Sequence, residues 1–117
     1  MGNLLTRTVP FFASVKGEVA HQVDLGVNYE KIGAESRVIK ALAYNEGDVQ
    51  VTLILQGSAN GTSWSNISTA VVPAKGKAIL SGAITPSYKW MRIYCSTSSG
   101  DSLGRIEIFD ESDAFKR

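Results

Sequence analysis

The stretch DVQVTLILQG, residues 48–57, alternates apolar and polar side chains more regularly than any other part of the chain. Because successive side chains of a strand point to opposite faces, this pattern separates the residues into two sets. One face carries Val49, Val51, Leu53 and Leu55, and the other carries Gln50, Thr52 and Ile54. The period of two predicts a strand with one face turned toward a core.

Similar runs fill most of the remaining sequence. YKWMRIYCS (88–96) and GRIEIFDE (104–111) alternate clearly, and weaker candidates lie at residues 8–15, 18–26, 36–45, 68–72 and 77–80. In the run 18–26, strict alternation would align Val19, His21, Val23 and Leu25 on one face. Turn-forming stretches such as NEGD (45–48) and PAKGK (73–77) separate the runs. This spacing predicts an all-β sandwich or barrel without specifying the strand order.

The composition is that of one folded domain. The chain has 117 residues, of which 44% are hydrophobic and 20% are charged, so it is neither disordered nor long enough for two ordinary domains. The net charge is +1, and no cluster of Lys and Arg is interleaved with aromatic residues, which argues against nucleic-acid binding. No apolar run approaches the roughly 20 residues of a membrane helix. Without a recognisable secretion signal, we expect a protein made in a cytoplasm that binds neither membrane nor nucleic acid.

The reactive residue types do not form a catalytic or metal-binding pattern. The single histidine, His21, and the single cysteine, Cys95, both lie in alternating runs, and Cys95 shares its face with Met91 and Ile93. A buried structural thiol is therefore favoured over a Cys–His nucleophile. One His and one Cys cannot complete a zinc site of the usual composition, and the acidic run at 110–113 lacks the spacing of a calcium loop. We predict that the protein is not an enzyme and needs no cofactor.

The first twelve residues, MGNLLTRTVPFF, differ from the rest because they carry one charged side chain and end in two phenylalanines. One interpretation is an edge strand after a frayed end, since Pro10 disfavours a central position in a sheet. The other is an arm that crosses to a neighbouring subunit, which would cover its apolar side chains. The predicted contact residues are Leu4, Leu5, Arg7, Pro10, Phe11 and Phe12. The chain then divides into an arm (1–12), a sandwich domain (13–110) and a tail (111–117).

The segment QGSANGTSW, residues 56–64, places turn-forming residues before a tryptophan. Asn60-Gly61 is typical of a tight primed hairpin turn, in which both central residues have positive φ. Trp64 follows this turn, and Trp90 lies on the face of its strand opposite Met91. Both indoles are candidate stacking platforms for a glycan, which requires that they be exposed on one face. The structural alternative is that Trp64 closes the edge of the core and Trp90 faces the second sheet.

The order of these segments resembles known sandwiches over roughly residues 7–109. VTLILQGSANGTSW (51–64), YKWMRIYC (88–95) and GRIEIFD (104–110) resemble the strand, S-x-D/N-G-x-x-W hairpin and closing strands of discoidin-like (coagulation factor 5/8 type C) domains. HQVDLGVNYEKIG (21–33) resembles the segment that precedes them. The chain looks more like short phage structural proteins, in which an R-T-V-P-F arm (7–11 here) and a DLG strand (24–26) precede the same hairpin. Asn60 stands where discoidin-like domains usually have Asp, and their paired cysteines are missing, so no ligand residues are carried over.

The resemblance implies a single antiparallel β-sandwich, jelly-roll or discoidin-like, with an extended N-terminal arm. The leading hypothesis is a non-enzymatic structural component of a bacteriophage virion, either a capsid decoration or cement protein or a head–tail accessory. It would be located in the virion after synthesis in the host cytoplasm. Its partners would be copies of itself and other virion proteins such as the major capsid protein, and deletion of residues 1–12 would weaken assembly. The alternative is a carbohydrate- or surface-binding module that uses Trp64 and Trp90, with a glycan as its partner.

Overall fold

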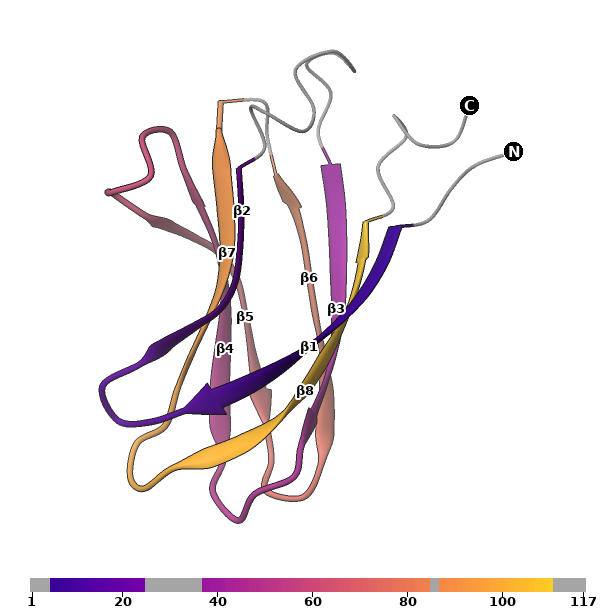
Figure 1. Cartoon of the computed structure of the whole chain (residues 1–117), viewed down its shortest axis with the longest axis vertical. Coiled ribbons are helices and arrows are strands. Elements are labelled where there is room, and N and C mark those ends of the chain that lie inside the picture. The colour runs from indigo at the N-terminus through magenta and orange to yellow at the C-terminus, as the bar shows by residue number, and fades with distance from the viewer. Residues whose placement is uncertain (1–4, 25–36, 85–86, 111–117) are drawn as a thin grey trace.

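Strands make up every regular element in the part of the chain that the structure describes. The computed structural model describes the backbone of residues 5–24, 37–84 and 87–110, and the side chains of residues 8–22, 38–84 and 87–109. The strands in these ranges are β1 (Leu5–Ala13), β2 (Glu18–Asp24), β3 (Arg37–Asn45), β4 (Val51–Ser58), β5 (Ser65–Val72), β6 (Lys77–Ile84), β7 (Trp90–Ser96) and β8 (Ser102–Asp110) (Figure 1). None of the described segments is a helix long and apolar enough to cross a membrane. Leu4, Leu25 and the predicted tail 111–117 lie outside the described residues.

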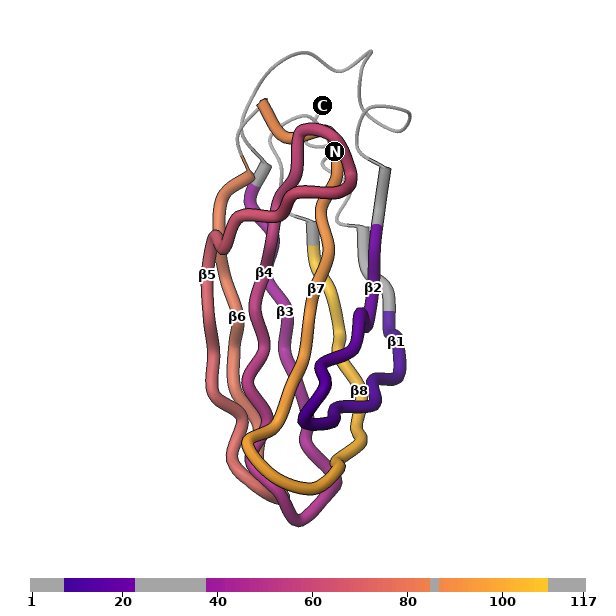
Figure 2. The backbone as a smooth tube through the Cα atoms, turned by 90° about the vertical axis from the view of Figure 1, so that its left-hand side faces the viewer, coloured from indigo at the N-terminus to yellow at the C-terminus, as the bar shows by residue number. Residues whose placement is uncertain are grey.

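The strands form two antiparallel sheets of four strands, packed as two layers that lie on the left and right in Figure 1. Figure 2 looks onto the layer that contains β7 and β4. Sheet A has the order β1-β8-β3-β6, and sheet B has the order β2-β7-β4-β5. Every connection crosses from one sheet to the other except that between β4 and β5, which pair as a hairpin. Eight strands wound in this way form a jelly roll. The predicted all-β sandwich is confirmed, and the first and last strands lie side by side in sheet A.

The core lies between the sheets and is filled by every second residue of the central strands. In β4 the burial alternates as the sequence predicts, and Val51, Leu53 and Leu55 are at most 1% exposed. The other two well-alternating strands, β7 and β8, contribute Met91, Ile93, Cys95, Ile106 and Ile108. Each fully buried aliphatic side chain of this size stabilises the fold by about 1.5–3 kcal/mol on leaving water. The three clearest periodic runs in the sequence therefore supply the centre of the core.

Strand β2 departs from the predicted alternation. Its pairing with β7 shifts register between Val19 and His21, so that Ala20 is an extra residue in the strand. Val19 lies opposite Tyr94 and is 45% exposed, whereas His21 lies opposite the buried Ile93. The expectation that Val19 and His21 share one face was wrong, because a β-bulge reverses the side to which the following residues point.

Three strands also extend beyond their predicted boundaries. Strand β1 begins at Leu5 rather than residue 8, and β5 begins at Ser65 rather than residue 68. Strand β6 continues through Gly82 to Ile84, although the glycine and its neighbouring serine are typical of a strand end. A Cβ at Gly82 would lie 3.0 Å from side-chain atoms of both Leu55 and Ile67. The glycine is therefore explained by close packing across the sandwich and not by a turn.

Candidate functional site

Over its described part, the predicted arm is an edge strand of the chain's own sheet. All residues of β1 from Leu5 to Ala13 pair with β8, and none of the described strands lies on the other side of β1. Pro10 is tolerated here because an edge strand can leave one amide position unused. This placement corresponds to the edge-strand interpretation of the segment. Contact between β1 and a neighbouring subunit stays a prediction.

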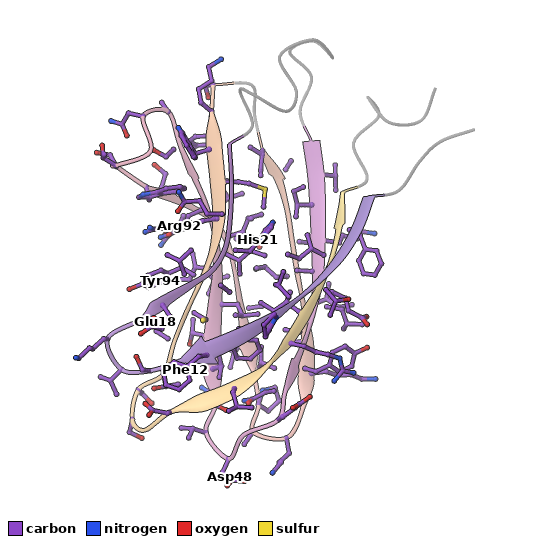
Figure 3. The ribbon with its side chains drawn as sticks, viewed as in Figure 1. Phe12, Glu18, His21, Asp48, Arg92 and Tyr94 are labelled. Carbon is purple, nitrogen blue, oxygen red and sulfur yellow. The ribbon has the colours of Figure 1, made fainter. Side chains whose placement is uncertain are left out.

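The alternation along β1 divides the predicted contact residues into two groups. Phe11 is 4% exposed and packs in the chain's own core, so it cannot reach a partner. Pro10 is exposed, and Phe12 is 47% exposed on the outer face of sheet A (Figure 3). The side chains of the other three predicted contact residues, Leu4, Leu5 and Arg7, lie outside the described ones. Pro10 and Phe12 are therefore the members of the set that the structure leaves available.

The outer face of sheet A carries more exposed apolar side chains than Phe12 alone. Leu103, the residue paired with Phe12 across β1 and β8, is 55% exposed. Val38 on β3 and Ile79 on β6 are 37% and 67% exposed, and they point outward because their neighbours Ile39 and Leu80 are buried. Phe12 and Leu103 are direct cross-strand neighbours, so they form one apolar patch at the β1 edge. We call these two residues the Phe12–Leu103 patch.

The loop that follows β4 is longer than the predicted turn. Six residues, 59–64, connect β4 to β5, and Gly61 has a φ of 82°. Among the described residues the one non-glycine residue with positive φ is Lys75, so Asn60 does not have it. The prediction of a tight primed turn at Asn60-Gly61 was therefore wrong. A primed turn joins strands by two residues, and six residues allow other conformations.

Side chains hold this hairpin tip in place of a tight backbone turn. Ser58 is 1% exposed, and its Oγ accepts hydrogen bonds from the amides of Asn60 and Gly61 at 3.2 and 2.8 Å. Oδ1 of Asn60 accepts hydrogen bonds from the amides of Thr62 and Ser63 at 2.8 and 2.9 Å. Such side-chain turns satisfy loop amides without a strand partner. They fix the direction in which the chain enters Trp64.

Arg92 is the centre of a polar and aromatic network on the outer face of sheet B (Figure 3). Its Cζ lies 4.2 Å from the centroid of the Trp64 ring and 5.1 Å from that of Tyr94. Its Nε donates to Oε1 of Gln56 at 2.7 Å, and Nε2 of Gln56 donates to Oδ1 of Asn66 at 2.8 Å. Trp64 therefore lies over a guanidinium group and does not close the edge of the core. Two aromatic rings and an amide together restrict the orientation of Arg92.

Trp90 lies on the same outer side of β7 as Arg92 and Tyr94, and does not face the second sheet. Both Trp64 and Trp90 are half-buried. The hairpin tip approaches Trp90 closely, since a Cβ at Gly61 would lie 3.2 Å from its Nε1. The two predicted stacking residues are thus on one face of the sandwich. Neither ring is fully open, because the tip covers part of Trp90 and Arg92 covers one side of Trp64.

The reactive side chain of Cys95 is part of the core. Cys95 is fully buried, and burial followed by the charge of Glu18 raises the pKa of its thiol to about 11. Its Sγ lies 3.2 Å from the carbonyl oxygen of Phe12, to which the thiol donates. In the described ranges, no three His, Cys, Asp or Glu side chains gather in a way that would hold a metal ion. The thiol is protonated at neutral pH and acts as a packed core residue.

Asn45 is a structural residue that the sequence patterns did not reveal beyond a turn at 45–48. It is 3% exposed, and both ends of its amide are occupied. Nδ2 donates to the carbonyl oxygens of Val49 (2.7 Å), Val72 (3.3 Å) and Pro73 (3.1 Å), while Oδ1 accepts from the amide of Gly47 (3.0 Å) and from Oγ of Ser102 (2.5 Å). This one side chain joins the ends of β3 and β5 to the start of β8. Only the folded arrangement brings these segments together.

Comparisons with known proteins identify the fold. No protein-family model matches the sequence, and no curated protein matches it either. The PBSX exported protein XepA is similar in structure, with a TM-score of 0.64 at 15% identity over 91% of this chain and 36% of its own. PirA gives a TM-score of 0.59 at 16% identity over 89% of this chain and 93% of its own. A protein of the Bacillus endospore appendages, which form disulfide-linked pili, gives 0.57 at 12% identity over 94% and 88%. At these identities the similarity shows a shared fold.

Proposed function

We propose that this protein is a non-enzymatic structural component of a bacteriophage virion, acting as a capsid decoration or cement protein or as a head–tail accessory. It would contact copies of itself and other virion proteins such as the major capsid protein. The observation that carries the proposal is the uncovered Phe12–Leu103 patch beside the free edge of β1. Burying a side chain of this size is worth about 1.5–3 kcal/mol, which a partner surface would recover.

The edge of β1 favours side-chain contact over full strand addition. An edge strand offers unpaired backbone groups to a second chain. Pro10 removes one donor from the middle of β1, so an added strand would be interrupted there. Phe12 lies two residues beyond this point and is exposed. We therefore expect Phe12 and Leu103 to be central to the contact, with the edge as an adjoining surface.

The fold is compatible with this role. Jelly rolls are the building blocks of many viral capsids and also of lectins. The endospore appendage protein, which has a similar fold, is part of pili that are linked by disulfides. This chain has one cysteine, Cys95, which is fully buried. Assembly of this protein would therefore depend on surface contacts and not on disulfide exchange.

A point variant tests the contact better than removal of the arm. Deletion of residues 1–12 would take away most of β1 and uncover the edge of β8, which would damage the fold itself. Phe12→Ser removes the exposed ring and leaves the strand in place. Val71→Ser is the matched control, because Val71 is 51% exposed on β5 of the other sheet. Light scattering after size exclusion, with cosedimentation on phage particles, should show weaker association for Phe12→Ser and no change for Val71→Ser.

The proposal would not survive a wild-type protein that stays monomeric at every concentration and does not cosediment with particles. Equal loss of association in Phe12→Ser and Val71→Ser would also contradict it, since the contact would then not be specific to the β1 edge. The position of the gene offers a second test. Neighbouring genes for capsid, portal or tail proteins are expected.

A carbohydrate-binding role is the second candidate, and the Arg92 network favours it. Arg92 is held between Trp64 and Tyr94 with its Nε bonded to Gln56, so the outer face of sheet B presents an ordered cation between aromatic rings. Sugars bind to aromatic rings flanked by a few well-placed polar groups. Titration with glycans should change tryptophan fluorescence in the wild type and not in Arg92→Met. A glycan array without any bound glycan would count against this role.

A further inference from the structure

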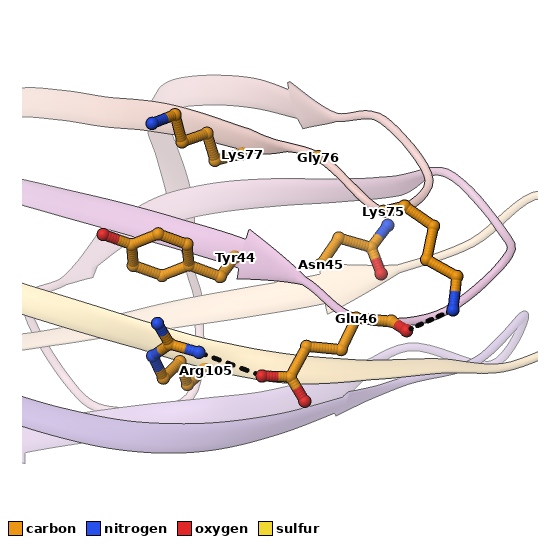
Figure 4. Close-up of a pocket in the computed structure, with 7 residues that line it drawn as sticks. All are labelled: Tyr44, Asn45, Glu46, Lys75, Gly76, Lys77 and Arg105. Atoms are coloured by element: carbon orange, nitrogen blue, oxygen red, sulfur yellow. Dashed lines mark hydrogen bonds and ion pairs between the residues drawn. The ribbon is translucent and has the colours of Figure 1, made fainter.

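An open pocket of about 500 Å³ lies on the outer side of sheet A, at the end of the sandwich where β3 leads into the turn before β4 (Figure 4). Its lining residues are Tyr44, Asn45, Glu46, Lys75, Gly76, Lys77 and Arg105. A volume of this size is in the range of sites for small organic ligands. None of these residues belongs to the Phe12–Leu103 patch or to the Arg92 network.

The pocket places two cations on either side of an aromatic ring. Lys77 pairs with Tyr44 across β6 and β3, and Tyr44 pairs with Arg105 across β3 and β8. Because neighbouring strands are about 4.8 Å apart, the backbones of Lys77 and Arg105 are about 10 Å apart with Tyr44 between them. Figure 4 shows the Tyr44 ring between the two basic side chains. A ligand that meets both charges would therefore lie across the Tyr44 ring.

The basic groups of the pocket are ordered to different degrees. The Arg105 guanidinium lies 4.1 Å from the centroid of the Tyr44 ring, and its Nη1 donates to Oε2 of Glu46 at 3.0 Å. Lys75 donates to the carbonyl oxygen of Glu46 at 3.2 Å and lies 3.5 Å from a carboxylate oxygen of Asp48. Lys77 has no ion-pair partner among the described side chains. The lining therefore combines three cations with one carboxylate, that of Glu46. This carboxylate pairs with Arg105 and does not neutralise the charge of Lys77.

The backbone below the pocket is held firmly. The amide of Asn45 donates to the carbonyl oxygen of Gly76 at 2.8 Å, and the amide of Lys75 donates to the carbonyl oxygen of Gly47 at 3.0 Å. The buried Asn45 side chain holds the same turn from below through its bond to the Pro73 carbonyl. A site with a fixed base loses less entropy when a ligand binds. The backbone of the pocket is thus preformed, and the exposed side chains of Lys75 and Lys77 can adjust to a ligand.

We propose that this pocket binds a sugar acid, that is, a monosaccharide unit with a carboxylate. Lys77 provides a charge-assisted donor for the carboxylate, and the N–H groups of Arg105 that are not bonded to Glu46 provide a second. Glu46 provides an acceptor for ligand hydroxyl groups, and its carboxylate would repel a dianion such as phosphate more strongly than the single charge of a sugar acid. Tyr44 also lines the pocket and supplies an aromatic ring that contacts the Arg105 guanidinium. A cation pair alone would accept any anion, but the added acceptor favours a ligand that has both a carboxylate and hydroxyl groups.

Amide chemical shifts measured during titration test the proposal. The probes are galacturonate and N-acetylneuraminate, which carry the carboxylate on different sugars, and the controls are galactose and acetate. At least one sugar acid should shift the amides of β3, β6 and β8 around Tyr44, and galactose and acetate should bind at least about tenfold more weakly, as expected for one charge-assisted hydrogen bond. Lys77→Met should reduce sugar-acid binding at least about tenfold. Lys89→Met, which removes an exposed lysine outside the pocket, should leave it unchanged.

Three outcomes would overturn the proposal. The first is the absence of shifts around Tyr44 with both sugar acids. The second is equal binding of acetate and the sugar acids, because the pocket would then attract any carboxylate. The third is loss of binding in Lys89→Met to the same extent as in Lys77→Met. Association through Phe12 is measured separately by light scattering, so failure here does not affect the proposed role in the virion.

Discussion

The two ends of the sandwich are each organised by an asparagine side chain, in opposite settings. Asn45 is 3% exposed and bonds to groups up to 57 residues away in the sequence. Asn60 is exposed, and its side chain bonds only within three residues of itself in the described structure. The first residue joins three strands, whereas the second shapes one hairpin tip. The same side chain thus serves the fold at one end and a local loop at the other.

The difference shows how burial determines what a polar residue contributes. A buried amide loses its water on folding, so every partner that it lacks costs free energy. An exposed amide can exchange its protein partners for water at little cost. The end at Asn45 is therefore fixed, which suits the base of a preformed pocket. The tip at Asn60 tolerates change, which suits a loop that carries Trp64 to a surface.

The largest expected effect is that of Asn45→Ala. The substitution leaves the Ser102 hydroxyl and the Gly47 amide without their Asn45 acceptor, and it removes one donor from each of three carbonyl oxygens. We expect the free energy of unfolding to fall by about 3 kcal/mol, because at least one of these groups stays buried and unpaired. Urea unfolding measures the change. Ser102→Ala is the control, which removes one of the five bonds and should cost about 1 kcal/mol.

If Asn45→Ala were no less stable than Ser102→Ala, the network around Asn45 would be replaceable by water. The contrast between the two ends would then disappear. Asn45→Asp distinguishes the loss of the donor from the loss of volume. It keeps the shape and Oδ1 but removes Nδ2, so it should remain clearly destabilised.

Cys95 extends the comparison to a buried group that titrates. Burial raises the pKa of its thiol from 9.0 to about 11, so the unfolded chain releases this proton at lower pH than the folded protein. The contribution to stability is complete below about pH 9 and is lost as the pH rises toward 11. We expect Cys95 to account for a loss of up to about 2 kcal/mol over this range. Urea unfolding of the wild type and of Cys95→Ala at about pH 9 and pH 11 isolates the effect. Equal loss of stability in the two proteins between these pH values would contradict it.

The sequence predicts those features of the fold that depend on neighbouring residues. Alternation in β4, β7 and β8 identifies the core because burial there repeats every two residues. The bulge at Ala20 has no such pattern, since an inserted residue changes the register without changing composition. Alternation also separates Phe11 from Phe12 once β1 is known to be a strand of the sheet.

The candidate sites were harder to predict because they join residues that are distant in the sequence. Trp64 reaches Arg92 only through the path of a six-residue loop, which the Asn60-Gly61 pair did not reveal. Lys77, Tyr44 and Arg105 become neighbours only when β6, β3 and β8 pair in this order. The strand order of a sandwich follows from contacts across the whole chain, and periodicity does not encode it.

A smaller effect is expected for Asn60→Ala at the hairpin tip. The change removes the acceptor for the Ser58 hydroxyl and for the amides of Thr62 and Ser63. The two amides belong to exposed residues and can bond to water instead. We expect a loss of no more than about 1 kcal/mol in the free energy of unfolding. Tryptophan fluorescence should change as well, because the tip positions Trp64 and contacts Trp90. A loss as large as that of Asn45→Ala would show that the tip is as important to the fold as the opposite end.

The smallest expected effect is a gain in stability at the Asn45 end, from Lys75→Gly. Lys75 has a φ of 57°, a left-handed conformation that costs a residue with a Cβ about 1 kcal/mol. The next residue, Gly76, does not have a positive φ. Gly76 has a different reason to be glycine, since a Cβ there would lie 2.9 Å from Cγ of Pro73. The ion pair of Lys75 with Asp48 is worth little, because both side chains are mostly exposed. Urea unfolding should show a gain of about 0.5 kcal/mol, reduced from the full backbone cost by the greater freedom of unfolded glycine. A loss would mean that the exposed contacts of Lys75 help to hold this end, so that Asn45 would not be its main support.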